Sequence, residues 1–370
     1  MRDILETIDA WCAAGTRFAV ASVVRTWSSS PKQPGAAMAV SEHGAVAGSV
    51  SGGCVEGAVY ELAQEVLETG VPALETYGVA DDDAFAVGLS CGGTLEVFVR
   101  RVGEGQFAQW AALAAAVREG RQAVTATVLA PGGATEVGAG QAGAALLVTG
   151  EDVIGSLRGT PERDAAAVAR LRELPSEHAA LRETADAGTH LFVESFTPPA
   201  RMLIFGAIDY AAALARIGRF LSYHVTVCDA RPVFATAARF PDAHEVVVDW
   251  PHRWLSAARA DARTVICVLT HEAKFDIPLL EVALRTDAAY IGAMGSRRTH
   301  EDRLRRLRES GVPDTALARL CSPIGLDLGG RSAPETAVSI AAEIIALRSG
   351  GTGRRLSTTT APLHAGSSTR

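Results

Sequence analysis

Hydrophobic and polar positions alternate along the first 197 residues in a way that predicts a mixed α/β domain. The apolar spacing predicts a helix over residues 1–15 that ends at Gly15. After Cys54, apolar residues that recur on one helical face predict a second helix, which ends at Gly70. Other expected elements are strands near 18–24, 37–40, 45–50, 94–99, 123–129, 144–149 and 189–196, and a helix over 107–118.

A different pattern begins after Pro198 and Pro199, two residues that cannot continue a helix or a central strand. From there, short apolar runs alternate with amphipathic stretches, which is typical of a parallel sheet connected by helices. We therefore expect an N-terminal α/β domain over 1–197 and a C-terminal Rossmann-like domain over 200–350. Residues 351–370 are rich in Gly, Ser, Thr and Arg and are expected to form a disordered tail.

Composition and charge narrow the class of protein. Hydrophobic residues make up 48% of the chain and charged residues 21%, which is the balance of a globular protein with a buried core. The formal net charge of −7 argues against a nucleic-acid partner, which needs a basic surface. No apolar run is long enough to span a membrane, and acidic residues stand at the start where a signal peptide has basic ones, so we expect a cytoplasmic protein. The six cysteines form no CxxC pair and are expected to be free thiols.

The turn after the first apolar run of the second half carries the Rossmann pattern in an altered form. Gly206 stands where the first glycine of a Gly-x-Gly-x-x-Gly turn belongs, and Asp229 follows about 20 residues later, where a carboxylate usually binds a ribose. Ile208 replaces the second glycine, which normally lets a pyrophosphate approach the backbone. Asp209 places a negative charge at the helix N-terminus, where it would repel a phosphate. The sequence thus favours a Rossmann scaffold and leaves open whether its usual ligand is lost or is bound differently.

Other polar residues are expected at the carboxyl ends of these strands, where open α/β sheets bind ligands. Arg231 follows the second strand, His271 follows the fourth, and Arg297 and Arg298 begin the helix after the fifth. They are candidates for contacts with a nucleotide or another anion, although His271 could instead cap a loop. The arginines between residues 303 and 308 are interpreted as a solvated helix face.

Two loops rich in glycine and cysteine are the main candidates for a binding site in the first half. The first, Ser51-Gly52-Gly53-Cys54, precedes a helix whose dipole favours a thiolate, and its glycines could expose amides to an oxyanion; Glu56 belongs to the same motif. The second, Ser90-Cys91-Gly92-Gly93, has the mirror arrangement and leads into a strand. A free cysteine is often only a small buried apolar residue. Two cysteines, each beside paired glycines, favour the close approach of a ligand.

Longer motifs extend over most of the chain. They are GSVSGGCVE at 48–56, GLSCGGTL at 88–95, LTH at 269–271, YIGAMGSRR at 290–298, SPIGLD at 322–327 and PETAVSIAAE at 334–343. In this order they resemble the XdhC/CoxI family, the accessory factors of xanthine dehydrogenase and of aerobic CO dehydrogenase. The resemblance runs from about residue 19 to residue 350.

The resemblance implies a non-catalytic chaperone that binds molybdenum cofactor, holds it while a terminal sulfur ligand is installed, and delivers it to a molybdenum hydroxylase such as xanthine or CO dehydrogenase. It implies two partners, the large subunit of the apo-hydroxylase and a cysteine desulfurase, and it is compatible with a homodimer. No residue is assigned to catalysis. The residues expected to contact the cofactor are Ser51, Gly52, Gly53, Cys54, Glu56, Ser90, Cys91, Gly92 and Gly93. Cys54 and Cys91 could act as soft ligands to molybdenum.

The chain departs from the family pattern at two places. The Rossmann turn of the family usually reads Gly-Ala-Gly-His, where this chain has Ile208 and Asp209, and this puts nucleotide binding in question. The early loop usually carries Arg where this chain has Lys32, which keeps the charge but not the bidentate fork.

Two other functions stay open on the sequence. One is an NAD(P)-dependent oxidoreductase that uses the Rossmann-like domain, although Ile208 and Asp209 disfavour it and no pair of catalytic acid and base residues is evident. The other is an assembly scaffold that binds protein partners but no cofactor.

Overall fold

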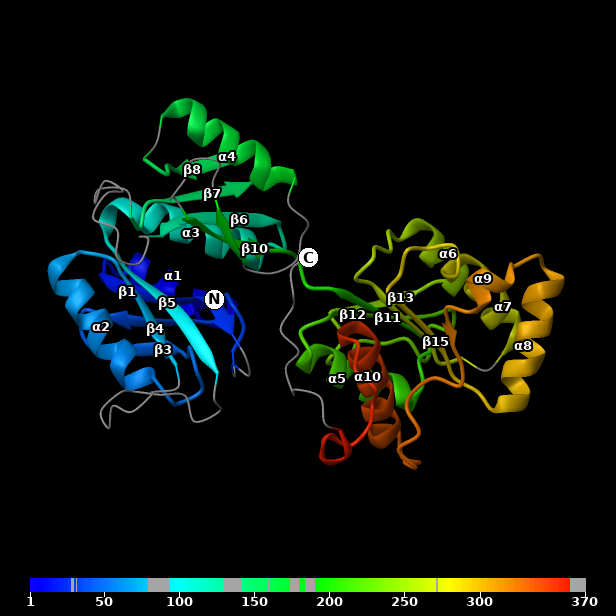
Figure 1. Cartoon of the computed structure of the whole chain (residues 1–370). Coiled ribbons are helices and arrows are strands. Elements are labelled where there is room, and N and C mark those ends of the chain that lie inside the picture. The colour runs from blue at the N-terminus through cyan, green and yellow to red at the C-terminus, as the bar shows by residue number, and fades with distance from the viewer. Residues whose placement is uncertain are drawn as a thin grey trace. The chain divides into compact units, whose positions relative to one another are not determined.

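The computed structural model divides the chain into an N-terminal unit, Met1–Pro198, and a C-terminal unit, Pro199–Thr359 (Figure 1). The structure describes residues 1–27, 30, 32–78, 93–129, 142–158, 160–173, 180–183, 190–270 and 272–359. No helix in these ranges is both long enough and apolar enough to cross a membrane.

Two five-stranded antiparallel sheets form the core of the N-terminal unit. Their strands are β1 Phe18–Trp27, β2 Ala37–Ser41, β3 Val46–Gly48, β4 Ala73–Tyr77, β5 Thr94–Val102, β6 Ala123–Leu129, β7 Ala145–Thr149, β8 Asp152–Gly155, β9 Ala180–Glu183 and β10 His190–Phe196. The order is β3-β2-β1-β5-β4 in the first sheet and β8-β7-β6-β10-β9 in the second. Strand β1 lies at the centre of the first sheet because its first seven residues are apolar or small, and all seven are buried.

Helices pack on these sheets through their apolar faces. The helices of the N-terminal unit are η1 Arg2–Ile4, α1 Leu5–Ala13, α2 Glu56–Thr69, α3 Glu104–Arg118 and α4 Pro161–Glu173. On α2, the residues Val59, Ala63 and Val66 belong to one cluster of buried side chains together with Val97 of β5. Helix α2 ends as predicted at Gly70, which takes the left-handed conformation that glycine allows (φ +73°).

The C-terminal unit contains one sheet of six parallel strands. They are β11 Arg201–Phe205, β12 His224–Asp229, β13 Glu245–Val248, β14 Val265–Val268, β15 Tyr290–Ala293 and β16 Leu320–Cys321. The order β13-β12-β11-β14-β15-β16 is that of the Rossmann fold, with the chain reversing direction across the sheet between β11 and β14. The prediction of an α/β protein with a Rossmann-like C-terminal domain is confirmed.

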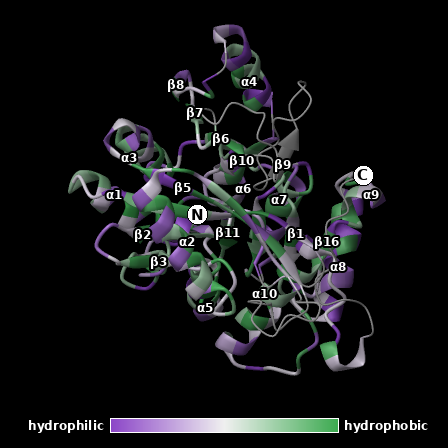
Figure 2. Ribbon diagram, turned by 60° about the vertical axis from the view of Figure 1, so that its left-hand side comes forward, coloured by the Kyte–Doolittle hydropathy of each residue, from purple (hydrophilic) through white to green (hydrophobic). Residues whose placement is uncertain are grey.

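Helices cover both faces of this sheet (Figure 1). They are α5 Asp209–Phe220, α6 Pro251–Ala257, α7 Ala273–Ala283, α8 Arg297–Glu309, α9 Asp314–Leu317 and α10 Ala333–Ser349. Helices α5 and α10 share one apolar cluster with the sheet, and α6 to α9 share another. On helix α5 the residues Ala211, Leu214 and Ala215 are buried. Figure 2 colours the ribbon by hydropathy, with hydrophobic residues in green and hydrophilic ones in purple.

A short 3-10 helix, η2 Leu356–Thr358, lies in the segment that the sequence predicts to be a disordered tail. Residues 360–370 of that segment lie outside the described residues.

Candidate functional site

The first glycine–cysteine loop turns around the side chain of Glu56, the first residue of α2. The Glu56 Oε1 atom accepts hydrogen bonds from the backbone amides of Ser51 (2.9 Å) and Gly52 (2.9 Å), and Oε2 accepts one from the amide of Gly53 (2.8 Å). The hydroxyl of Ser49 donates to Oε1 (2.7 Å), and the hydroxyl of Ser51 donates to Oε2. Three amides and two hydroxyls therefore surround one carboxylate.

This arrangement corrects one expectation from the sequence. The amides of Gly52 and Gly53 are not open to an oxyanion of a ligand, because Glu56 already accepts their hydrogen bonds. Partial burial favours the neutral form of Glu56, but the hydrogen bonds from Ser51, Ser49 and the loop amides outweigh it and hold the pKa of Glu56 far below its usual range. Glu56 is thus a fixed negative charge within the loop.

The glycines of the loop are required by their conformation. Gly52 (φ +86°) and Gly53 (φ +122°) both lie in the left-handed region, and, apart from the adjoining residues, no atom of the described residues lies within 4 Å of the position that a Cβ would take on either. The Ser51 hydroxyl accepts hydrogen bonds from the amides of Cys54 (3.0 Å) and Val55 (3.1 Å), which leads the chain into α2. Cys54 itself is partly exposed.

The second glycine–cysteine loop is described only at its last residue. Ser90, Cys91 and Gly92 lie outside the described residues, and Gly93 is buried directly before β5. Val55 of the first loop belongs to the same buried cluster as Leu95, two residues after Gly93. The convergence of the two loops on one ligand stays a prediction.

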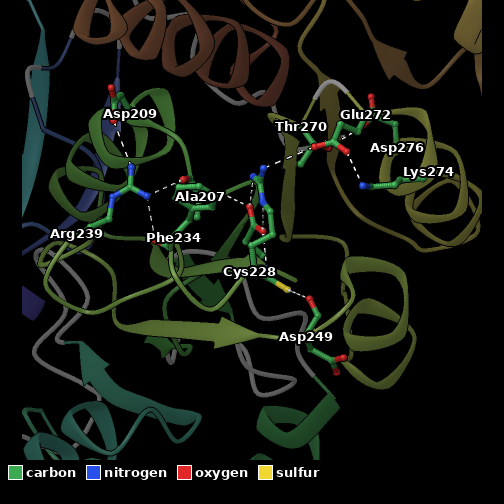
Figure 3. Close-up of polar contacts among 12 residues, drawn as sticks. Ala207, Asp209, Cys228, Phe234, Arg239, Asp249, Thr270, Glu272, Lys274 and Asp276 are labelled. Atoms are coloured by element: carbon green, nitrogen blue, oxygen red, sulfur yellow. Dashed lines mark hydrogen bonds and ion pairs between the residues drawn. The ribbon is translucent and has the colours of Figure 1, made fainter.

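The altered Rossmann turn follows β11 at the carboxyl end of the C-terminal sheet (Figure 3). Gly206 has a positive φ of +110°, and a Cβ there would lie 2.9 Å from the Cγ2 atom of Thr270, so the position admits only glycine. Arg239 donates to the carbonyl oxygen of Ala207 (3.2 Å) and forms an ion pair with Asp209 (3.4 Å). Arg239 thus binds the turn through a carbonyl and a carboxylate oxygen.

Asp229, the expected ribose ligand, has its carboxylate fully occupied. Its Oδ2 accepts from the amide of Ala207 (2.7 Å) and from Nη2 of Arg231 (2.9 Å), and its Oδ1 accepts from the amide (2.9 Å) and Nε (3.0 Å) of Arg231. A carboxylate has about four acceptor positions, so none is left for ribose hydroxyls. Burial disfavours the charged form, but these hydrogen bonds outweigh it and lower the pKa of Asp229. Asp229 therefore connects β11 to β12 and does not present a free carboxylate.

The remaining cationic candidates do not form one cluster. Arg231 lies 4.8 Å from the ring centre of Phe234 and 3.6 Å from the carboxylate of Glu272. Arg297 and Arg298 are exposed in the first turn of α8, and their side chains form no hydrogen bond or ion pair with another of the described residues. His271 is not among the described residues.

A buried ion pair at the same edge of the sheet was not predicted from the sequence. Arg303 of α8 contacts Asp276 of α7 (2.8 Å), and their side chains are 2% and 5% exposed. Arg303 also donates to the carbonyl oxygen of Met294 (2.9 Å) and to the hydroxyl of Ser322 (3.0 Å), while Thr270 donates to Asp276. The interpretation of 303–308 as a solvated face is therefore wrong for Arg303, which holds together the loops after β14, β15 and β16.

The last two family motifs meet in a second structural contact. Glu343 of α10 accepts hydrogen bonds from the amide of Gly325 (2.9 Å) and from the hydroxyl of Tyr290. Ser339, one turn earlier on α10, donates to the carbonyl oxygen of Leu326. These motif residues fix α10 and the loop at 322–327 to the sheet. In the described ranges, no group of three or more His, Cys, Asp or Glu side chains is arranged to hold a metal ion.

The fold and its contacts define an α/β protein with a Rossmann-like unit. In this unit the carboxylate of Asp229, which stands at the usual ribose-binding position, binds other groups of the protein instead. Two family models match the chain: the XdhC and CoxI family over residues 11–78, which includes the Glu56 loop, and the XdhC Rossmann domain over residues 202–344. The chain belongs to the XdhC/CoxI family.

Several known proteins are similar to this chain. A Bacillus subtilis protein named as a probable xanthine dehydrogenase subunit is 25% identical over 331 residues, which is 89% of this chain and 92% of that protein. "Molybdenum cofactor insertion chaperone PaoD" of Escherichia coli is 27% identical over 157 residues, 42% of this chain and 43% of PaoD, so that match spans less than half of either protein. A crystal structure of a xanthine dehydrogenase from Bacillus halodurans has the same fold (TM-score 0.71, 24% identity, covering 96% of this chain and 98% of that one).

Proposed function

We propose that this protein is a molybdenum cofactor insertion chaperone that delivers the cofactor to a molybdenum hydroxylase. The observation that carries the proposal is its membership of the XdhC/CoxI family together with its similarity to PaoD, whose name assigns that role to PaoD. The similarity to the Bacillus subtilis protein, which is named for xanthine dehydrogenase, supports a hydroxylase as the partner.

We propose that the loop around Glu56 binds molybdenum cofactor. Molybdenum cofactor combines a soft metal–sulfur centre with a pterin and a phosphate. The partly exposed Cys54 offers a soft sulfur donor. No described residue outside the loop itself fills the space beside Gly52 and Gly53, which lets a bulky group approach the backbone there. We assign the same role to the loop Ser90-Cys91-Gly92-Gly93.

Three finer features of the function belong to the same proposal. The chaperone holds the cofactor while a cysteine desulfurase supplies the terminal sulfur ligand, it acts in the cytoplasm, and it forms a homodimer. The family resemblance supports the sulfuration step and the homodimer.

A dinucleotide-dependent oxidoreductase is disfavoured by the C-terminal unit. Asp229 has no acceptor position left for a ribose. Titration with NADH, followed by its fluorescence, should give no saturation below about 1 mM, which corresponds to about 4 kcal/mol of binding free energy.

Transfer of the cofactor tests the proposed function directly. Chaperone loaded with molybdenum cofactor is mixed with an apo-hydroxylase, and the hydroxylase activity that appears is compared with that from free cofactor at the same concentration. We expect more activity from the loaded chaperone. Equal activity from free cofactor, with no complex between chaperone and hydroxylase, would contradict the proposal.

A further inference from the structure

The carboxylate of Glu56 occupies a site that has the form of an anion-binding nest. Successive backbone amides in a turn form a concave surface that binds phosphates and other anions in many proteins. Here the amides of Ser51, Gly52 and Gly53 all donate to Glu56 at 2.8–2.9 Å, and the Ser49 hydroxyl adds a fourth donor at 2.7 Å. A residue of the chain therefore takes the place of an external anion.

An external phosphate competes poorly for this position. Glu56 is attached to the same turn, so its effective concentration at the amides is in the millimolar range or above. A phosphate would have to displace the carboxylate and then lie beside its negative charge.

The same contacts fix the backbone next to Cys54. Glu56 accepts hydrogen bonds from the amides of Gly52 and Gly53. The Ser51 hydroxyl donates to Oε2 of Glu56 and accepts from the amide of Cys54, so it connects the two residues. The glycines have no Cβ that would restrain their dihedral angles. Their conformation therefore depends on the hydrogen bonds to Glu56.

We propose that Glu56 is a positioning residue that excludes phosphate from the loop at 49–54 and holds Cys54 in place, so that the loop recognises the metal–sulfur end of the cofactor and not its phosphate. This inference rests on the proposed function for the identity of the cofactor. The role of Glu56 in the loop does not depend on it. The phosphate of the cofactor then binds elsewhere on the protein.

The rate at which Cys54 is alkylated measures the state of the loop without any cofactor. Iodoacetamide is used as the probe, and the modified peptides are quantified by mass spectrometry. Burial raises the pKa of Cys12 to about 11, of Cys228 to about 12 and of Cys321 to about 11, which keeps these thiols protonated and slow to react near neutral pH. Cys54 and Cys91 share a segment without lysine or arginine, residues 33–99, so cleavage after glutamate is used to place them on separate peptides.

Removal of the carboxylate should loosen the loop and open the nest. In Glu56→Ala we expect the alkylation of Cys54 to be at least ~10 times faster, because several charge-assisted hydrogen bonds are lost. Inorganic phosphate should then slow the reaction again in a saturable manner, with a midpoint of ~1–10 mM as expected for a small surface anion site. Wild-type protein should not respond to phosphate over this range.

Two variants serve as controls. Glu61→Ala changes an exposed carboxylate on the same helix and should leave both the rate and the phosphate response as in wild type. Glu56→Gln keeps the size of the side chain, and its thermal unfolding midpoint shows whether the unit remains folded. Three outcomes would overturn the inference: wild-type protein that phosphate protects, a Glu56→Ala rate equal to wild type, or a faster rate that phosphate does not reverse.

A comparison of two ligands tests which end of the cofactor the loop recognises. Molybdenum cofactor and the metal-free molybdopterin are each bound to wild type and to Cys54→Ala, and the bound pterin is measured by fluorescence after oxidation. We expect the preference for the metal-containing ligand to fall at least ~10-fold in Cys54→Ala, because loss of an outer-shell partner alone already costs about 10- to 100-fold in metal affinity. An unchanged preference would contradict the assignment. If wild type retains neither ligand, the proposed function fails, while the phosphate experiment still decides the role of Glu56.

Discussion

Glu56 and Asp229 each lie beside a turn whose amides point at their carboxylate. Glu56 accepts from the amides of residues 51 to 53, and Asp229 accepts from the amides of Ala207 and Arg231. A buried carboxylate needs such donors because burial alone disfavours its charge. The result in both units is a negative side chain that fixes the conformation of the backbone turn beside it. In the C-terminal unit, this is the position at which Rossmann folds bind a ribose.

Asp229 should therefore contribute to stability through its charge. In Asp229→Asn the side-chain amide cannot accept all four hydrogen bonds, so we expect a loss of about 1–3 kcal/mol in the free energy of unfolding at pH 7. Because the pKa of Asp229 is lowered on folding, its contribution is present above the ordinary pKa of 3.8 and is lost as pH falls through the folded value. Urea unfolding at pH 7 and pH 3 measures the difference in the free energy of unfolding between wild type and Asp229→Asn. This difference should be smaller at pH 3. An equal difference at both values would contradict a charge effect.

Glu194 on β10 should show the opposite pH dependence. It is 7% exposed, and burial raises its pKa to about 7, although the N-terminal amino group of Met1 and the guanidinium of Arg100 act against the shift. An acid whose pKa rises on folding destabilises the fold as pH rises from about 4.5 to about 7. Glu194→Gln should remove this dependence of the free energy of unfolding on pH. For the change in the pKa of Glu194, the effect between pH 5 and pH 8 is roughly 2–3 kcal/mol.

Urea unfolding at pH 5 and pH 8 tests the role of Glu194. The matched control is Glu173→Gln, which changes an exposed carboxylate in the same unit. If the free energy of unfolding of the wild-type protein is no lower at pH 8 than at pH 5, the assignment is contradicted.

At the scale of the elements, the apolar pattern predicts a strand or a helix where a run of residues, or one face of a helix, is buried. Strand β1 and helix α2 were predicted for this reason, and both place apolar residues in the core. Helix α4 was missed because, of its 13 residues, only Leu171 is buried, so no apolar face is visible in the sequence. Strand β16 was missed because it has only two residues and is fixed by pairing with β15.

The candidate site follows the same rule. The loops and the altered Rossmann turn were recognised because glycine and cysteine mark them in the sequence. The partners of the polar side chains were not predicted, because hydrogen bonds between segments depend on the folded geometry. Arg303 is the clearest case: its place one turn before the buried Leu307 on α8 was the signal for burial, but its partner Asp276 lies 27 residues away.

The ion pair between Arg303 and Asp276 should be important for the stability of the C-terminal unit. Asp276→Ala leaves a buried guanidinium without its partner, and we expect a loss of about 3–5 kcal/mol in the free energy of unfolding. Asp302→Ala is the matched control on the surface of α8, where Asp302 pairs with Arg305 and Arg306. That change should cost less than about 1 kcal/mol. Similar losses for the two variants, measured by urea unfolding, would show that the buried pair has no special role.

At the scale of the whole molecule, the two units contribute different parts of the account. The N-terminal unit carries the Glu56 loop, which belongs to the segment that matches the XdhC and CoxI family. The C-terminal unit keeps the order of a Rossmann sheet, but its acidic residue is occupied. Together they fit a protein that receives and passes on a cofactor better than one that carries out dinucleotide chemistry.

The most direct test is the molybdenum and pterin content of the protein after purification from cells that make molybdenum cofactor. The account predicts both in equal, stoichiometric amounts in the wild-type protein, with a lower content in Cys54→Ala and none after expression in cells that cannot make the cofactor. Wild-type protein that contains neither molybdenum nor pterin, while the hydroxylase of the same cells is fully loaded, would contradict it.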